Sequence, residues 1–229
     1  MKQVGLIGVG RMGEVLSEKL AGHINLKIFD RDESHMQEVA DSLGVQTAAS
    51  LEELADWGPV ILVVPDREVI NVIKDFNQMG RPLSVINVAT NVAQPVLEMT
   101  ASPQVKCIGA KFVAQAREIA LGAEPVIIVN ERPAELVEIA REILAPVGKI
   151  FVGSADVVTY INTQAAEKAL TAAVMLEETL RCQPYINTDM IKSAIRQVAA
   201  GVLKAYADDD LGPFAREIVR AIKSKLRKA

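Results

Sequence analysis

The sequence predicts an α/β protein in which a doubly wound, mostly parallel sheet is followed by a smaller, all-helical C-terminal domain. Two observations favour this fold class. Over residues 1–153, short apolar runs rich in Val and Ile alternate with helical patterns, which is typical of βαβ units. From residue 155 onward no strand pattern remains, and stretches rich in Ala, Leu and Met indicate helices alone. We therefore expect two domains, spanning residues 1–153 and 154–229.

The ends of the elements can also be read from the sequence. Gly22 and Gly44 are placed to cap the C-terminal ends of two helices, and Ser50 with Glu53 forms a capping-box pattern at the start of another. The expected strands are residues 4–8, 25–30, 60–64, 85–88, 105–109, 126–129 and 149–152.

The first helix expected in the second domain covers residues 155–179 and is apolar or small around most of its surface. Breaks at Gln183-Pro184 and at residues 208–213 separate it from the later helices. A helix of this composition needs to be covered on several sides, and so short a domain barely covers it alone. We therefore expect a homodimer or a higher homo-oligomer, formed through the helical domain.

Composition and charge exclude several classes of function. A net charge of -4 argues against a nucleic-acid partner, and no apolar run approaches the roughly 20 residues that span a membrane. Cys107 and Cys182 stand in no C-x-x-C motif and beside no histidine cluster, so no metal site is expected. The N-terminus lacks the pattern of a signal peptide, which predicts a cytoplasmic protein.

A glycine-rich segment follows the first expected strand and opens the first helix. In that setting it matches the G-x-G-x-x-G pattern of a Rossmann-type dinucleotide-binding domain. The first glycine is expected to allow a tight turn, the second to let the backbone approach a pyrophosphate, and the third to let helix and strand pack closely. Phosphates would bind at the positive end of the helix. The residues expected to bind NAD or NADP here are Gly8, Val9, Gly10, Arg11, Met12 and Gly13.

Asp30 ends the second expected strand, where a carboxylate would accept hydrogen bonds from the adenine ribose. This position favours NAD. Arg31 follows at once, however, and its guanidinium could pair with the 2′-phosphate of NADP. The choice between the two cofactors therefore stays open, with a preference for NAD.

Two further strand ends should face the same crevice, since ligands of such sheets bind beyond the carboxyl ends of the strands. Val64 and Pro65 would lie along the cofactor, and Ala89 to Asn91 near its nicotinamide. We count Val64, Pro65, Ala89 and Asn91 among the residues expected to bind the cofactor. The two histidines, His23 and His35, are interpreted as surface residues.

The segment VGLIGVGRMGEVL, the strand ending in Val64-Pro65 and the helical stretch ADVVTYINTQAAEKALTAAVMLEETL together resemble pyrroline-5-carboxylate reductase. That family belongs to a superfamily with 6-phosphogluconate dehydrogenase and the β-hydroxyacid dehydrogenases. The resemblance implies a cytoplasmic NAD(P)-dependent oxidoreductase that reduces a small cyclic imine or carbonyl compound by hydride transfer, with a helical domain for substrate binding and dimerisation.

The substrate segments of that family are not retained. Its S-G-S-G-P-A-Y segment aligns with residues 162–168, which keep none of the seven residues, and its T-S-P-G-G-T-T segment has no counterpart. A β-hydroxyacid dehydrogenase-like enzyme is an alternative, although the serine and glycines of its D-A-P-V-S-G-G segment are lost at residues 109–115. A second alternative is a dinucleotide-binding oligomer without catalytic turnover, acting as a sensor or scaffold.

Four polar residues are candidates for the chemistry. Lys168, on the long helix, is expected to donate a proton or stabilise charge, and Asn162 to orient a polar substrate during catalysis. Gln164 is the third candidate on that helix, and is expected to bind substrate. Lys111 is expected to follow a strand end directly and to bind a substrate carboxylate.

Overall fold

A computed structural model describes residues 1–227. The described chain divides into two compact units, residues 1–163 and the residues from 164 onward. Helix α8 (Val157–Arg181) begins in the first unit and continues into the second. The boundary expected from the sequence, 153/154, falls just before this helix.

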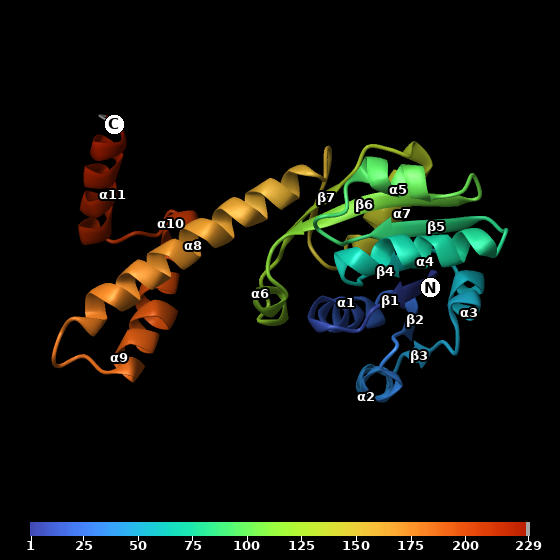
Figure 1. Cartoon of the computed structure of the whole chain (residues 1–229), viewed down its shortest axis with the longest axis horizontal. Helices are drawn as coiled ribbons and strands as arrows, with labels where there is room; N and C mark the ends of the chain where they lie inside the picture. The colour runs from blue at the N-terminus through green and yellow to red at the C-terminus, as the bar shows by residue number, and fades with distance from the viewer. Residues whose placement is uncertain (228–229) are drawn as a thin grey trace. The chain divides into compact units, whose positions relative to one another are not determined.

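The first unit is built on one sheet, with strands in the order β3-β2-β1-β4-β5-β6-β7-β8 (Figure 1). Neighbouring strands are parallel, except that β6 and β7 run antiparallel. The strands are β1 (Gln3–Ile7), β2 (Asn25–Phe29), β3 (Gln46–Thr47), β4 (Val60–Leu62), β5 (Leu83–Asn87), β6 (Val105–Val113), β7 (Val126–Val129) and β8 (Lys149–Val152). The predicted fold class, a doubly wound and mostly parallel sheet before a helical C-terminal region, is confirmed.

Helices bury their apolar faces in two hydrophobic clusters of the first unit. One cluster holds residues of α1, α2 and α7, and the other holds residues of α3, α4 and α5. In α4 the buried side chains Val69, Val72, Ile73 and Phe76 follow the spacing of one helical face, each contributing about 1.5–3 kcal/mol. The helices are α1 (Arg11–Ala21), α2 (Glu33–Leu43), α3 (Leu51–Trp57), α4 (Asp66–Gln78), α5 (Gln94–Thr100), α6 (Ala116–Ala120) and α7 (Ala134–Leu144).

The sequence-based prediction was wrong about the end of β6. The strand continues past Gly109 to Val113 because it changes partners there: residues 105–109 pair with β5 and residues 110–113 pair with β7. Lys111 therefore lies within the strand and does not follow its end. The two-residue strand β3 was also not predicted, since it is too short to show a period.

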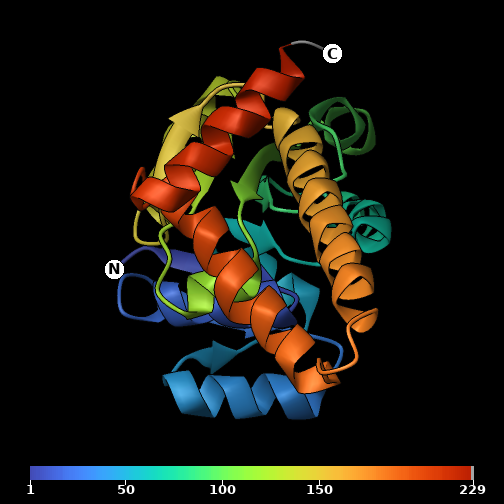
Figure 2. The same ribbon diagram turned by 90° about the vertical axis from the view of Figure 1, so that its left-hand side faces the viewer.

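The second unit is helical and exposes much of its apolar surface. Helix α9 (Thr188–Ser193), a π-helical segment (Ala194–Ala199) and α10 (Ala200–Ala207) continue as one rod, followed by α11 (Pro213–Leu226) (Figure 2). Among residues 164–227, Ile191 alone is buried. Large apolar side chains are exposed along α8, the rod and α11, among them Leu170, Val174, Val198, Leu203, Phe214 and Ile222.

None of the helices within residues 1–227 is both long enough and apolar enough to span a membrane. The cytoplasmic location stays a prediction from the sequence.

Candidate functional site

The glycine loop between β1 and α1 is tightly packed on one side and open on the other. Gly8 has a φ of 97°, and a Cβ atom there would lie 2.5 Å from the Val63 carbonyl oxygen. A Cβ atom on Gly13 would lie 1.8 Å from the Gly8 carbonyl oxygen, so the helix could not pack as it does. A Cβ atom on Gly10 would meet nothing within 4 Å. Gly10 is thus the glycine that leaves open space above the start of α1.

That open space belongs to a groove of about 990 Å³ along the carboxyl ends of the parallel strands. The groove lies where the strand order reverses between β1 and β4, which is where ligands bind in open α/β sheets. Nine of the residues predicted to bind cofactor line it: Gly8, Gly10, Arg11, Met12, Asp30, Arg31, Val64, Pro65 and Ala89. The other three, Val9, Gly13 and Asn91, do not line it. Val9 and Asn91 are hydrogen-bonded to the groove residues Asp30 and Asp66, and Gly13 packs against the backbone of Gly8.

Val9 connects the glycine loop to the end of β2. Its amide donates to one carboxylate oxygen of Asp30 at 2.6 Å, and the amide of Asp32 donates to the other at 3.0 Å. The carbonyl of Val9 lies 3.0 Å from Nε2 of His35, a residue that the sequence analysis interpreted as a surface histidine. Asp30 therefore holds the loop in place and at the same time presents its carboxylate to the groove.

Arg31 is bound by a residue of α4. One of its terminal nitrogens lies 3.1 Å from Oε2 of Glu68, and Oε1 of the same glutamate lies 3.7 Å from Nε of Arg67. All three side chains line the groove next to Asp30. Arg67 and Glu68 were not predicted, although their place two and three residues after Pro65 was a usable signal, because it puts them in the first turn of the helix that follows β4.

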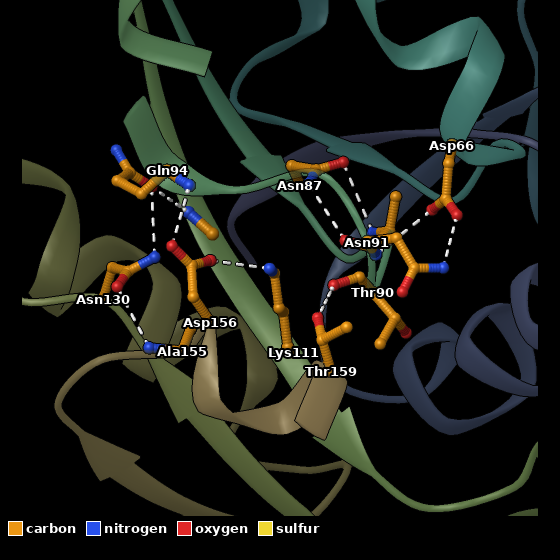
Figure 3. Close-up of polar contacts among 12 residues, drawn as sticks. Asp66, Asn87, Thr90, Asn91, Gln94, Lys111, Asn130, Ala155, Asp156 and Thr159 are labelled. Carbon is orange, nitrogen blue, oxygen red and sulfur yellow. Dashed lines mark hydrogen bonds and ion pairs between the residues drawn. The ribbon is translucent and has the colours of Figure 1, made fainter. Parts of the chain in front are cut away.

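The loop after β5 forms another wall of the groove, with Ala89 and Thr90 lining it. Asn91 turns toward α4, and its Nδ2 donates to Oδ2 of Asp66 at 2.7 Å (Figure 3). The hydroxyl of Thr159, in the first turn of α8, donates to the carbonyl of Thr90 at 2.6 Å (Figure 3). Contacts from α4 and α8 thus fix this loop.

Lys111 does not line the groove but forms an ion pair with Asp156. Its Nζ lies 2.6 Å from Oδ1 of Asp156, and its side chain is 1% exposed against 34% for Asp156. The other oxygen of Asp156 accepts from the amide of Gln94 at 3.2 Å (Figure 3). Because Lys111 is in β6 and Asp156 precedes α8, the pair connects the sheet to the start of the long helix.

Gln94 and Asn130 extend this buried network. The Gln94 oxygen accepts from the Gly109 amide at 2.8 Å and from Nδ2 of Asn130 at 3.2 Å, and Asn130 accepts from the Ala155 amide at 3.0 Å. The Gln94 amide group also donates to the carbonyl of Cys107 at 3.0 Å.

Burial raises the pKa of the Cys107 thiol to about 12, so the thiol stays protonated and is no nucleophile at neutral pH.

The residues of α8 that were predicted to be catalytic, Asn162 and Lys168, or to bind substrate, Gln164, fall in both units. Asn162 lies in the first, where its Nδ2 donates to the carbonyl of Phe112 at 2.9 Å. Gln164 and Lys168 lie in the second, each next to the carboxylate of Glu167. The Lys168 side chain is 73% exposed. Within residues 1–227, no three His, Cys, Asp or Glu side chains are grouped so as to hold a metal ion.

Residues 3–78 match the family described as the NAD binding domain of 6-phosphogluconate dehydrogenase. This segment is similar to that NAD-binding domain. It contains the glycine loop, Asp30, Arg31, Val64 and Pro65, and the match confirms the predicted cofactor class, NAD or NADP. A comparison with curated protein sequences gave no match.

Solved structures with the same fold extend the comparison beyond the NAD-binding domain. A pyrroline-5-carboxylate reductase from Coxiella burnetii has a TM-score of 0.72 at 13% identity, covering 99% of this chain and 92% of that one. A Plasmodium falciparum pyrroline carboxylate reductase with NADP bound has a TM-score of 0.65 at 15% identity, covering 99% and 91%. An imine reductase from Myxococcus stipitatus in complex with NAD⁺ has a TM-score of 0.62 at 14% identity, covering 91% and 77%.

At these identities the likeness shows the fold, and the predicted resemblance to pyrroline-5-carboxylate reductase is confirmed at that level. Together with the NAD-binding domain, the fold supports the enzyme class that the sequence predicts, an NAD(P)-dependent oxidoreductase.

Proposed function

We propose that this chain is an NAD(P)-dependent oxidoreductase that reduces a small imine or carbonyl compound by hydride transfer. The groove at the carboxyl ends of β1, β2, β4 and β5 carries the proposal, since it joins the open glycine loop to Asp30 and to the Val64-Pro65 wall. The nicotinamide, when bound, supplies the hydride. The fold likeness to pyrroline carboxylate and imine reductases supports imines as the first substrates to test.

The residues of this chain suit the parts of a dinucleotide. Gly10 brings no side chain to the N-terminus of α1, so the first-turn amides and the helix dipole are available to a diphosphate. The carboxylate of Asp30 would accept a hydrogen bond from the adenine ribose. Val64, Pro65 and Ala89 would exclude water along the cofactor.

For the chemical step, we retain Asn162 and Lys168 as candidates. The amide nitrogen of Asn162 is bound to Phe112, which leaves its oxygen to accept a hydrogen bond from a polar substrate. Lys168 stays the candidate for supplying a proton to the reduced heteroatom, and Gln164 stays the candidate for binding substrate. Lys111 is bound to Asp156 outside the groove, and we find no support for its contact with substrate.

Nucleotide binding followed by turnover tests the proposal. The purified chain is titrated with NADH and NADPH, and the oxidation of the bound form is then followed with a panel of cyclic imines. The reverse direction is followed as the reduction of NAD⁺ or NADP⁺ by 3-hydroxy acids. We expect at least one nucleotide to bind and one compound to react. Failure of both nucleotides to bind would contradict the proposal.

A dinucleotide-binding oligomer without turnover is the second candidate. The substitution of all seven residues of the reductase family's S-G-S-G-P-A-Y segment at 162–168 favours it. Binding of a nucleotide without reaction of any compound in the panel would support this candidate over the first.

We also propose that the helical unit mediates self-association, with a second copy of the chain covering its apolar side chains. Leu170 and Val174, one turn apart on α8, are 66% and 57% exposed. We expect light scattering to give at least a dimer for the natural chain, and a monomer when both residues are changed to Glu. A monomeric natural chain would contradict this expectation, and an unchanged helical circular-dichroism signal of the double variant serves as its folding control.

A further inference from the structure

Glu68 lies between two arginines at the edge of the groove. It is in the first turn of α4, where the helix dipole stabilises a carboxylate. Its two oxygens lie 3.1 Å from Arg31 and 3.7 Å from Arg67. Its side chain is 23% exposed, whereas those of Arg31 and Arg67 are 77% and 84% exposed. The glutamate is therefore the better fixed member of the group.

This group stands next to Asp30, where the adenine ribose of a dinucleotide would bind. The 2′ position is what distinguishes the two cofactors, because NADP carries a phosphate there with a charge of about -2 at neutral pH. Arg31 is the cation next to Asp30 in the sequence, and it would have to bind that phosphate. In the structure its guanidinium already has an anionic partner.

The charges around Asp30 therefore oppose a 2′-phosphate in two ways. A phosphate would have to displace Glu68 from Arg31, and it would then lie near the carboxylates of both Asp30 and Glu68. A ribose hydroxyl meets neither difficulty, since it is neutral and can donate to Asp30. The carboxylates of Asp30 and Glu68 thus favour NADH, although Arg31, which NADPH would need, is present.

We propose that Glu68 determines the cofactor preference of this chain by neutralising Arg31, so that NADH binds better than NADPH. The inference rests on the proposed function, because it concerns the same groove. It separates the role of Glu68 from that of Asp30: the aspartate accepts from the ribose hydroxyls of NADH and repels a 2′-phosphate directly, whereas the glutamate opposes the phosphate by holding Arg31.

The test measures the dissociation constants of NADH and NADPH by calorimetry, without substrate, for the natural chain and for Glu68→Gln. Glutamine keeps the size of the side chain and removes its charge. We expect the natural chain to prefer NADH, and the variant to bind NADPH about tenfold more tightly while its affinity for NADH changes little.

Two further variants test whether the freed Arg31 causes the gain in NADPH affinity. Glu33→Gln removes a carboxylate at the start of α2 that does not line the groove, and its preference should match that of the natural chain. Arg31→Ala combined with Glu68→Gln should lose the gain in NADPH affinity, since the freed guanidinium is its source. Unchanged NADH affinity in Glu68→Gln shows that the variant is folded.

The outcomes separate this inference from the proposed function. A natural chain that binds NADH, with an unchanged NADH/NADPH ratio in Glu68→Gln, would overturn the inference and leave the proposed function in place. A natural chain that already prefers NADPH would overturn it equally. Failure to bind either nucleotide would overturn both.

Discussion

Replacing Gly10 with valine is expected to weaken NADH binding by about a hundredfold or more, with little change in the free energy of unfolding. The backbone at Gly10 has φ -74° and ψ -172°, an extended conformation that valine also adopts, and its Cβ atom would have no atom of the protein within 4 Å. The space that it fills is the groove above the start of α1. The valine methyl groups would therefore keep a diphosphate away from the helix N-terminus. Calorimetric titration and urea unfolding measure the two quantities.

Two other glycines of the same helix provide the controls. Gly22→Val, at the C-terminal end of α1, also adds a side chain in open space but lies outside the groove, and NADH affinity should be unchanged. Gly13→Ala should instead lower the free energy of unfolding by about 2–3 kcal/mol, since its Cβ would lie 1.8 Å from the Gly8 oxygen. If Gly10→Val bound NADH normally, the glycine loop would not be the nucleotide site.

Replacing Asp156 with alanine is expected to lower the free energy of unfolding of the first unit by about 3 kcal/mol. The substitution leaves the Lys111 ammonium, 1% exposed and 2.6 Å from the lost oxygen, without its anionic partner. The value is at the low end for breaking a buried ion pair, because Asp156 is about one-third exposed and the pair is partly screened. Urea unfolding followed by the fluorescence of Trp57, the one tryptophan of the chain, measures the loss.

Removing Lys111 and removing Asp156 should lower the free energy of unfolding by different amounts. Lys111→Met leaves Asp156, which can turn toward water, so its cost should be clearly smaller than that of Asp156→Ala. Combining Lys111→Met with Asp156→Ala should recover most of the stability, because no buried charge then remains. Equal decreases in the free energy of unfolding for Lys111→Met and Asp156→Ala would contradict this explanation of the ion pair.

The glycine-loop side of the groove was predictable because its signals are local. The glycine pattern, the strand before it and the helix after it occupy one short stretch, and Asp30 and Val64-Pro65 mark the ends of strands with a clear apolar period. The mostly parallel sheet followed from the same alternation of strands and helices. Nine of the predicted cofactor residues line one groove because strand ends in such a sheet meet at one edge.

The position of Lys111 within β6 and its contact with Asp156 were not predictable from local patterns. Its charge interrupts an apolar run, so the strand was expected to end at Gly109. In the structure the strand continues because β7 pairs with residues 110–113. The charge is accepted inside the fold only because Asp156 reaches it from the segment before α8.

The sequence by itself determined the sheet domain, its glycine loop and the helical character of the second unit, because glycine positions and hydrophobic periods are patterns that extend over only a few residues. Only the tertiary structure decided that Arg31 binds Glu68, that Lys111 binds Asp156 and that His35 contacts the glycine loop. The residues of each of these contacts are far apart along the chain. They meet because the sheet places distant strand ends side by side, which no local pattern records.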